Sequence, residues 1–463
     1  MDVATPQSGD NFNNTAYQIH LALLTIMRKT TSLAHVAVTA NILQWYDFSI
    51  SAYLAIALGP LFFGGHDDFT ALIQSFSVFA VSYLMRPLGS MAFGYIGNRT
   101  NPGVALRWST LLMAIPTVFI GLLPTYRDIG HTATILMVTL KLIQGFAAGG
   151  ELPLSAYYVV SHADPQKKGL LSSLVHAGGI SGLLLASLLA FLLSSLFSSQ
   201  EIEHGAWRIP FLLGIPFFLV ISKIRGGIIA NGKISTAHHE NNKTSNPKNL
   251  NAFFRGALLV TAMNVGFYTL FVWMPNYTEF VLKYSHFDAH LSNTLAMIGY
   301  IGAIIGSGLF SRFVNYKKIL ITSLWSISVL VYPLFMLLQD IHAFPLLFSI
   351  QCIFALLYGP IHGIIWLVLY DLFKDNWKNF GFSITFTLPT AIFGGTAPLI
   401  CSYLVGQLHY LDFPAFYLTF FSLIAIPAAY GLNSFKKLPA QKSLPRGNTH
   451  MTGTDVSQHS HIR

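Results

Sequence analysis

Residues 170–197 read LLSSLVHAGGISGLLLASLLAFLLSSLF, a stretch that contains no Asp, Glu, Lys or Arg. About 20 apolar residues are enough for one helix to cross the hydrocarbon core of a bilayer. The chain as a whole is 53% hydrophobic and only 10% charged, whereas soluble domains carry about 25% charged residues. The composition therefore indicates a membrane protein and excludes a soluble enzyme, a disordered chain and a disulfide scaffold.

About twelve apolar runs of this kind follow one another along the 463 residues. A polar stretch in the middle divides them six and six, and a weak repeat supports two halves, because Thr39-Ala40-Asn41 resembles Thr261-Ala262-Met263-Asn264. We predict an all-α integral membrane protein of about twelve transmembrane helices in two six-helix bundles. The predicted parts are an N-terminal tail (1–30), a bundle (31–229), a linker (230–251), a second bundle (252–435) and a C-terminal tail (436–463).

The distribution of basic residues predicts the orientation. Most of the 27 Lys and Arg residues fall on the side that would hold both termini and the linker, and only Arg127, Arg208 and Lys283 fall in the opposite loops. Cytoplasmic loops are the ones enriched in Lys and Arg. We therefore expect a multi-pass protein of the inner (plasma) membrane with both termini in the cytoplasm. Topology explains the net charge of +9, so no nucleic-acid partner is predicted.

Four ionisable side chains fall within the predicted helices: Asp47, Arg86, Lys141 and Glu151. Such residues are costly in a membrane and mark functional sites. A rise of about 1.5 Å per residue puts Asp47, Arg86 and Glu151 at similar depths, where they could share a polar chamber. Lys141 precedes Glu151 by ten residues on the same helix and would lie about 15 Å nearer the outside than Glu151. We therefore expect Lys141 to be a charge of the outer vestibule. One interpretation is a structural ion-pair set, and the other is proton coupling, with Glu151 as the first candidate and Asp47 as the second.

Aromatic side chains within the predicted helices are a second group of candidates. Trp45, Tyr268, Trp273 and Trp366 could line a cavity and bind a quaternary ammonium group through cation–π attraction, although most such residues pack in the core or at the interface. The 17 histidines are scattered, so no metal site is predicted. His176 is followed by Gly178 and Gly182, which would allow another helix to approach closely.

Four motifs occur in order: Asn41-Ile-Leu-Gln-Trp-Tyr-Asp-Phe48, Leu84-Met-Arg-Pro-Leu-Gly89, Lys141-Leu-Ile-Gln-Gly-Phe-Ala-Ala-Gly-Gly-Glu151 and Ala206-Trp-Arg-Ile-Pro-Phe211. In these motifs the chain resembles the metabolite:proton symporter family of the major facilitator superfamily. That family includes proline/betaine, α-ketoglutarate, citrate and shikimate permeases. The resemblance implies that the four ionisable residues handle substrate or proton.

Two positions depart from the family pattern. Gln44 occupies a position where members commonly carry Glu, and an amide cannot carry a proton. In the loop after the second helix, Asn98 replaces the usual Asp and is followed by Arg99. The resemblance implies a gating role for this pair, so the replacement could shift the balance between conformational states.

We expect proton-coupled symport of an organic acid, an amino acid or a zwitterion such as proline or betaine. The candidate substrate-binding residues are Arg86, Lys141, Gln44, Trp45, Tyr268, Trp273 and Trp366. The expected partners are the small-molecule metabolite, the proton and the lipid bilayer, and the protein would act as a monomer. The sequence contains no G-x-x-x-x-G-K-[ST] motif, so ATP-driven transport is not expected. It contains no H-E-x-x-H or G-x-S-x-G motif that would argue for an enzyme. We expect no enzyme and no cofactor, and the proton gradient would supply the energy. Two alternatives stay open, a proton-driven drug or siderophore exporter and a receptor-like relative that transports nothing.

Overall fold

The computed structural model describes residues 34–35, 38–39, 41–42, 44–64, 68–99, 102–216, 218–219, 247–340, 343–373 and 378–432. Across these ranges the regular structure is helical, without a strand. The first part contains α2 (Ala55–Phe63), α3 (Asp68–Leu84), α4 (Arg86–Arg99), α5 (Pro102–Leu122), α6 (Tyr126–Ile129), α7 (His131–Ala148), α8 (Glu151–His162), α9 (Lys168–Leu196), α10 (Ser199–Glu201) and the π-helix η1 (Ile202–Ala206). The second part contains α12 (Pro247–Phe267), η2 (Tyr268–Trp273), α13 (Met274–Phe280), α14 (His286–Phe310), α15 (Tyr316–Asp340), α16 (Phe344–Leu372), α17 (Lys378–Pro389), η3 (Thr390–Gly394), α18 (Ala397–Gly406) and α19 (Phe413–Tyr430).

Many of the described helices have the length and the apolar composition of a membrane span. Nine stretches are long and apolar enough to cross a bilayer, and a tenth is formed if the bent pair Gln44–Tyr53 and Ala57–Phe63 is one span. A shorter apolar helix covers Trp108–Leu122. These elements coincide with the predicted apolar runs and confirm a multi-pass all-α protein. The predicted tails, and nearly all of the predicted linker, lie outside the described residues, so the five-part division stays a prediction.

Two of the spans are interrupted, and they contact each other at the interruptions. Met85 separates α3 from α4, and Gly149 and Gly150 separate α7 from α8. A Cβ atom at Gly145 would overlap the backbone carbonyl of Ser82, and one at Gly149 would overlap that of Arg86. Only glycine permits this approach, which brings two backbones into direct contact. The breaks therefore hold Arg86 against the end of α7.

The glycines of α9 confirm the predicted close approach. A Cβ atom at Gly178 would collide with the backbone of Val38, and one at Gly182 would collide with the carbonyl of Ile42. The two glycines are four residues apart, so they lie on one face of α9. The first membrane helix therefore lies directly against the fifth.

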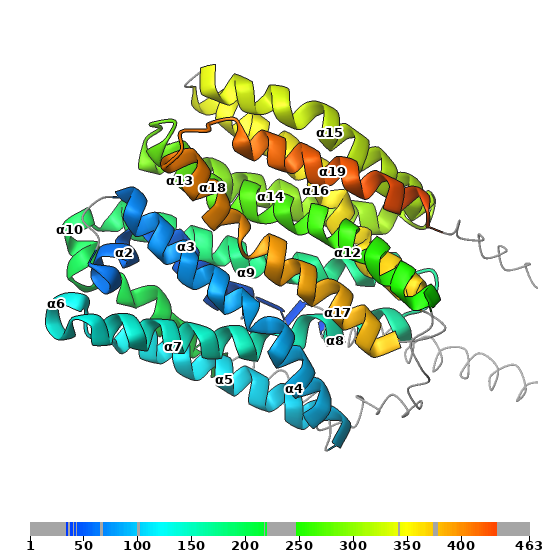
Figure 1. The fold of residues 1–463 in the computed structure, drawn as a ribbon, viewed down its shortest axis with the longest axis horizontal. Coiled ribbons are helices and arrows are strands. Elements are labelled where there is room, and N and C mark those ends of the chain that lie inside the picture. The colour runs from blue at the N-terminus through cyan, green and yellow to red at the C-terminus, as the bar shows by residue number, and fades with distance from the viewer. Residues whose placement is uncertain are drawn as a thin grey trace, which may run out of the picture. The chain divides into compact units, whose positions relative to one another are not determined.

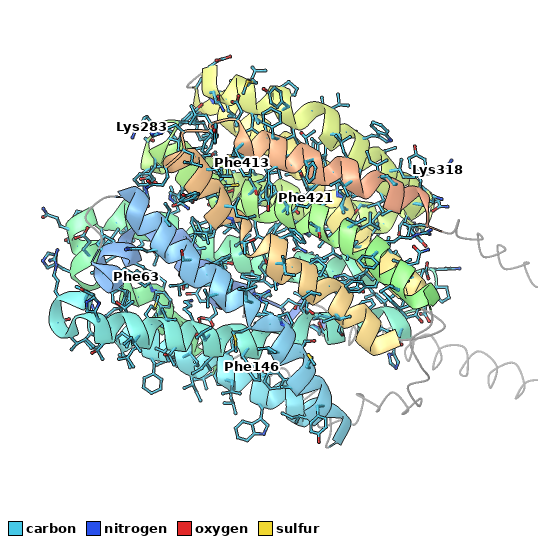
Figure 2. All side chains as sticks on the ribbon, viewed as in Figure 1. Phe63, Phe146, Lys283, Lys318, Phe413 and Phe421 are labelled. Carbon is cyan, nitrogen blue, oxygen red and sulfur yellow. The ribbon has the colours of Figure 1, made fainter. Side chains whose placement is uncertain are left out.

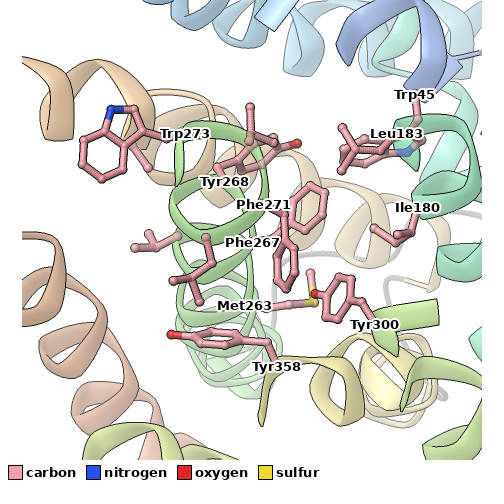
Figure 3. Packing of buried hydrophobic residues seen from close by; sticks show 14 of the residues in the cluster. Trp45, Ile180, Leu183, Met263, Phe267, Tyr268, Phe271, Trp273, Tyr300 and Tyr358 are labelled. Carbon is pink, nitrogen blue, oxygen red and sulfur yellow. The ribbon is translucent and has the colours of Figure 1, made fainter. Parts of the chain in front are cut away.

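Helices from the two parts of the chain pack together along α9 and α14 (Figure 1). Aromatic side chains fill the core beside this contact (Figure 3), where the rings of Phe271 and Tyr300 stack with their centroids 4.3 Å apart. The π-helix η2 carries Tyr268 into the same core, since that side chain is fully buried. Single π-helical turns within α-helices are frequent at functional sites.

Candidate functional site

A polar ladder joins the helical segment 44–53 to α7. Gln144 donates from Nε2 to Asp47 Oδ2 at 2.9 Å, and Gln44 donates from Nε2 to the carbonyl of Ala148 at 3.0 Å. Lys141 donates from Nζ to Ser51 Oγ. The three positions on each helix are three or four residues apart, so they form one stripe on each helix. The stripes face each other and satisfy polar groups that would otherwise be unpaired in the membrane.

Asp47 lies at the centre of the ladder and borders a cavity. Its side chain is 3% exposed, and Oδ1 has no hydrogen-bond partner among the described residues. The cavity has a volume of about 250 Å³ and is lined mainly by apolar residues of α5 together with Gly214, Ile215 and Phe218. Thr117 of α5 also lines it and accepts a hydrogen bond of 2.8 Å from Gln144. Asp47 is therefore a buried carboxylate with one free oxygen beside an open space.

Lys141 is the cation that acts on Asp47, which corrects the expectation of an outer-vestibule charge. The two side chains interact electrostatically without a direct ion pair. Lys141 Nζ lies 5.9 Å from the centre of the Phe48 ring and borders a second cavity of about 20 Å³, which also touches Ser51. A cavity of that size has room for one water molecule. Lys141 therefore belongs to the same polar ladder as Asp47.

Arg86 lies among aromatic rings. Its guanidinium carbon is 3.7 Å from the centre of the Tyr83 ring and 4.6 Å from that of Phe48. The hydroxyl of Tyr83 is hydrogen-bonded to the hydroxyl of Tyr268. Arg86 Nε has no partner among the described residues. Arg86 therefore lies where Tyr83 of the first half meets Tyr268 of the second half. Its Nε–H group is a hydrogen-bond donor without an acceptor among the described residues.

Glu151 does not join Asp47 and Arg86 in an ion-pair set. It begins α8, where it accepts a hydrogen bond of 3.2 Å from Ser109 Oγ of α5. The ion pairs within 4.0 Å that occur among the described residues involve Glu279, and none joins two of Asp47, Arg86 and Glu151. Glu151 follows Lys141 and Gln144 in the same span, beyond Gly149 and Gly150. Glu151 and Arg86 therefore form no direct ion pair, and the convergence of the three charges in one polar chamber stays a prediction.

The predicted aromatic residues separate into three places. Trp45 stacks on Tyr268 with ring centroids 6.2 Å apart, beside Arg86. Trp366 stacks on His176 at 4.9 Å and lies 4.4 Å from the ring of Phe386. Trp273 donates from Nε1 to Ser402 Oγ at 2.9 Å and stacks on Tyr277 at 4.8 Å. Tyr268 therefore lies with Arg86, and Trp45 is connected to this place through its stacking on Tyr268, whereas Trp273 packs within the second half.

The two gating candidates lie at the end of α4. The backbone of Asn98 and Arg99 is helical there, and their side chains lie outside the described residues. The gating role of this pair therefore stays a prediction.

Several residues of the site were not singled out from the sequence. Tyr83, Ser51, Thr117 and Gln144 all contact a predicted site residue. Gln144 had a signal that could have found it, because it follows Lys141 by three residues in the same motif and must share its helix face. The others are polar side chains whose neighbours depend on tertiary contacts.

Contacts between the two halves occur at both ends of α9. Near its beginning, Ser172 Oγ donates to the carbonyl of Gly363 at 3.4 Å. Near its end, the hydroxyls of Ser187 and Thr294 lie 2.7 Å apart. Tyr53 also donates to the carbonyl of Phe271 at 2.9 Å. Because Ser172 and Ser187 are separated by about 22 Å along the helix, the halves contact each other at two well-separated levels of α9.

Comparison with known proteins agrees with this arrangement. The family model of the Major Facilitator Superfamily matches residues 37–398. The glycine betaine/proline/ectoine/pipecolic acid transporter OusA of Dickeya dadantii is 27% identical over 92% of this chain and 87% of its own length. The proline/betaine transporter of Escherichia coli K12 is 27% identical over 88% of this chain and 84% of its own.

A putative proline/betaine transporter of Staphylococcus aureus is 29% identical over 83% of this chain and 84% of its own. Among solved structures, the proton:xylose symporter XylE superposes with a TM-score of 0.68 at 15% identity, over 87% of this chain and 94% of that chain. The likeness to XylE concerns the fold. The family match covers most of the chain, and this chain is therefore a membrane transport protein of the Major Facilitator Superfamily.

Proposed function

We propose that this chain carries a small zwitterion of the proline or betaine kind together with a proton. The relatives that match most of its length are transporters of proline, glycine betaine, ectoine and pipecolic acid. These solutes combine a carboxylate with a cationic nitrogen centre. A site for them needs a cation to bind the carboxylate and aromatic or anionic groups to bind the nitrogen.

Arg86 with Trp45, Tyr83 and Tyr268 is the observation that carries the substrate part of the proposal. Arg86 Nε is buried and has no partner among the described residues, and a guanidinium binds a carboxylate through charge-assisted hydrogen bonds. Tyr268 interacts with Arg86, and Trp45 stacks on Tyr268 with ring centroids 6.2 Å apart; aromatic rings attract quaternary and secondary ammonium groups. The four residues therefore supply both halves of zwitterion recognition.

Asp47 is the carboxylate whose geometry best supports proton coupling. Its oxygen Oδ1 is unpaired among the described residues, and Lys141 interacts with it without a direct ion pair. A carboxylate that gains and loses a cationic neighbour takes up and releases a proton. Asp47 also borders a cavity, so we give Asp47 the first place and Glu151, which accepts a hydrogen bond from Ser109, the second.

Uptake into proteoliposomes tests the proposal. The purified protein is reconstituted, a pH difference is imposed, and accumulation of labelled proline and glycine betaine is compared with their exchange at equal pH. We expect Asp47→Asn to abolish accumulation and to retain exchange, because exchange needs no net proton movement. Glu151→Gln serves as the matched carboxylate variant and should retain accumulation.

The same assay separates the other outcomes. Accumulation by Asp47→Asn at the parental level would refute Asp47 as the coupling group, and loss of accumulation only in Glu151→Gln would assign coupling to Glu151. Absence of uptake for every carboxylate-containing zwitterion tested, with proton-driven efflux of a larger compound, would favour export.

We further propose that the protein acts as a monomer in the inner membrane, with the linker and both termini in the cytoplasm. Lys283 and Lys318 lie at opposite ends of the helices (Figure 2), and the basic-residue pattern assigns them to opposite sides. Labelling of single cysteines placed at positions 283 and 318 by an impermeant reagent tests the orientation. Reaction at 283 and not at 318 in intact cells is the expected result.

A further inference from the structure

Three potential metal ligands meet where α13 connects to α14. His286 Nδ1 lies 2.8 Å from Glu279 Oε2, and His290 Nε2 lies 3.6 Å from the same oxygen. One ligand atom from each residue lies within 4.8 Å of those of the other two. His286 and His290 are four residues apart on α14 and therefore project from the same face. The turn before α14 brings Glu279 back to that face.

The burial of the cluster separates it from an ordinary surface ion pair. His290 is 2% exposed, and its Nδ1 has no hydrogen-bond partner among the described residues. Glu279 is 18% exposed, whereas His286 is 46% exposed. The cluster thus has one buried ligand, His290, and one exposed ligand, His286. An ion could enter from the exposed side and be bound by the buried histidine.

We propose that Glu279, His286 and His290 bind a divalent transition metal ion of the zinc class. Zinc takes imidazole nitrogens at about 2.0–2.1 Å and carboxylate oxygens at about 2.0–2.2 Å in a tetrahedral arrangement. Ligand atoms in such a shell are roughly 3.4 Å apart, as follows from those bond lengths. The distances of 2.8 Å and 3.6 Å from Glu279 Oε2 to the two histidine nitrogens bracket that value. Two histidines and one carboxylate leave the fourth position for water, and this ligand set disfavours magnesium and calcium.

The position of the site gives bound metal a consequence for transport. Tyr53 of the first half packs against His290 with ring centroids 6.4 Å apart. One turn further along α14, Asn293 donates to the hydroxyl of Tyr53 at 3.3 Å, and Thr294 contacts Ser187. A metal ion that immobilises the start of α14 therefore stabilises this contact between the halves. Zinc should slow uptake by holding that end of the transporter closed.

Metal titration of the full-length protein in detergent tests binding. Zinc is titrated by calorimetry, and cobalt is added separately, because its visible absorption reports four-coordinate geometry. We expect the variant in which Glu279→Gln, His286→Ala and His290→Ala are combined to lose one equivalent of zinc and the four-coordinate cobalt signal. His290→Ala alone should weaken binding by about 100-fold or more, since even the loss of groups behind the ligands costs 10–100-fold.

The exposed His131, which contacts Tyr126, provides the matched control. His131→Ala should keep the parental stoichiometry, which also accounts for zinc held by the other histidines of the chain. Thermal unfolding without metal verifies that each variant is folded, and His290→Gln replaces His290→Ala if the alanine variant is not. An unchanged stoichiometry and cobalt spectrum in the triple variant would overturn the proposal.

The uptake assay tests the consequence, and this part alone depends on the proposed function. Zinc should reduce the initial rate in the parental protein and in His131→Ala, and it should have no effect on the triple variant. Magnesium and calcium should not reduce the rate in any of them. Zinc that binds at this site and leaves the parental rate unchanged would overturn the closing role.

Discussion

The two halves of this transporter use different chemistry on a similar scaffold. The buried charged side chains Asp47, Arg86, Lys141 and Glu151 all belong to the first half of the part of the chain that the structure describes. In the second half, the buried polar groups near the contact between halves include the amide of Asn293, the hydroxyl of Thr294 and His362, which has a 2.7 Å hydrogen bond to Tyr300, and none of the buried residues there is Asp, Glu, Lys or Arg among the described residues. We infer that the first half carries charge during transport, while the second supplies a neutral aromatic surface.

The shared scaffold is visible in the asparagines of the weak sequence repeat. Asn41 donates to the carbonyl of Val175 on α9 at 3.4 Å. Asn264 donates to Thr390 in η3 at 2.9 Å. Each asparagine thus ties the first helix of its half to the fifth. The two halves therefore share a contact between their first and fifth helices, although they differ in their buried charged side chains.

Removal of Lys141 should have the largest effect on the charged half. Lys141→Met leaves Asp47 without its cationic neighbour, and an uncompensated buried charge costs about 3–5 kcal/mol. We expect a fall of several degrees in the melting temperature of the purified protein. The double variant with Asp47→Asn should recover most of that loss, because both charges are then gone. A double variant as unstable as Lys141→Met would show that the two groups are independent.

Arg86 and its neighbour Tyr268 in the second half should contribute unequally to substrate binding. Arg86→Ala should raise the KM for proline by about 10–100-fold, because hydrogen bonds to charged groups contribute about 1.5–3 kcal/mol. Arg86→Lys should recover part of the loss, since lysine keeps the charge and lacks the planar fork. Tyr268→Phe retains the ring and should change KM by less than Arg86→Ala. Equal KM values for Arg86→Ala and Arg86→Lys would argue against a carboxylate contact.

A pair of glycines, one from each half, tests the close helix contact at Gly145. Gly145→Ala in α7 places a methyl group against the carbonyl of Ser82, whereas a Cβ atom at Gly299 in α14 has no atom within 4 Å. Overpacking costs about 1–3 kcal/mol, so Gly145→Ala should lower the melting temperature. Gly299→Ala should leave it unchanged or raise it, because alanine favours the helix. Equal shifts in the two variants would refute the close contact at Gly145.

Apolar periodicity and ionisable residues predicted much of this architecture. The apolar runs became the spans, Gly178 and Gly182 became a helix contact, and the four ionisable side chains proved to be buried. The spans, the close helix approach at glycine and the burial of the ionisable residues depend on local composition, which can be read directly from the sequence.

Partner assignment could not be predicted in the same way. Depth along each helix placed Lys141 far from Asp47, because it ignored the lateral reach of a lysine side chain and the offset between two antiparallel helices. Glu151 follows Gln144 by seven residues, which is about two turns of an unbroken helix, so it would share the face of Gln144. That spacing did not predict the contact that Glu151 makes with Ser109 of α5. His286 and His290 had the spacing of a metal site, but the return of Glu279 depends on the fold of the intervening turn.

The smallest effect is expected at the helix starts outside the membrane, where the halves can again be compared. In the first half, Asp128 accepts hydrogen bonds from the backbone N–H and the hydroxyl of Thr125, at 2.8 Å and 2.9 Å. These two bonds, the backbone one first, hold the pKa of the Asp128 carboxyl below its ordinary value. In the second half, Ser285 Oγ accepts a hydrogen bond from the backbone N–H of Asp288 at 3.0 Å. Neither group of that hydrogen bond changes its charge with pH.

The pH dependence of the two caps should therefore differ. A carboxyl whose pKa is lower in the folded protein stabilises the fold above its unfolded pKa, about 3.9 for Asp, and loses that contribution as the pH falls through the folded value. Asp128→Asn should lower the melting temperature slightly at neutral pH and have no effect well below pH 3.9. Ser285→Ala should lower it by a similar amount at both pH values, since removal of a serine cap costs about 1 kcal/mol without a change of charge. A difference between Asp128→Asn and the parental protein that persists at the acid end would show that hydrogen-bond geometry, and not the charge of the carboxylate, stabilises the start of α6.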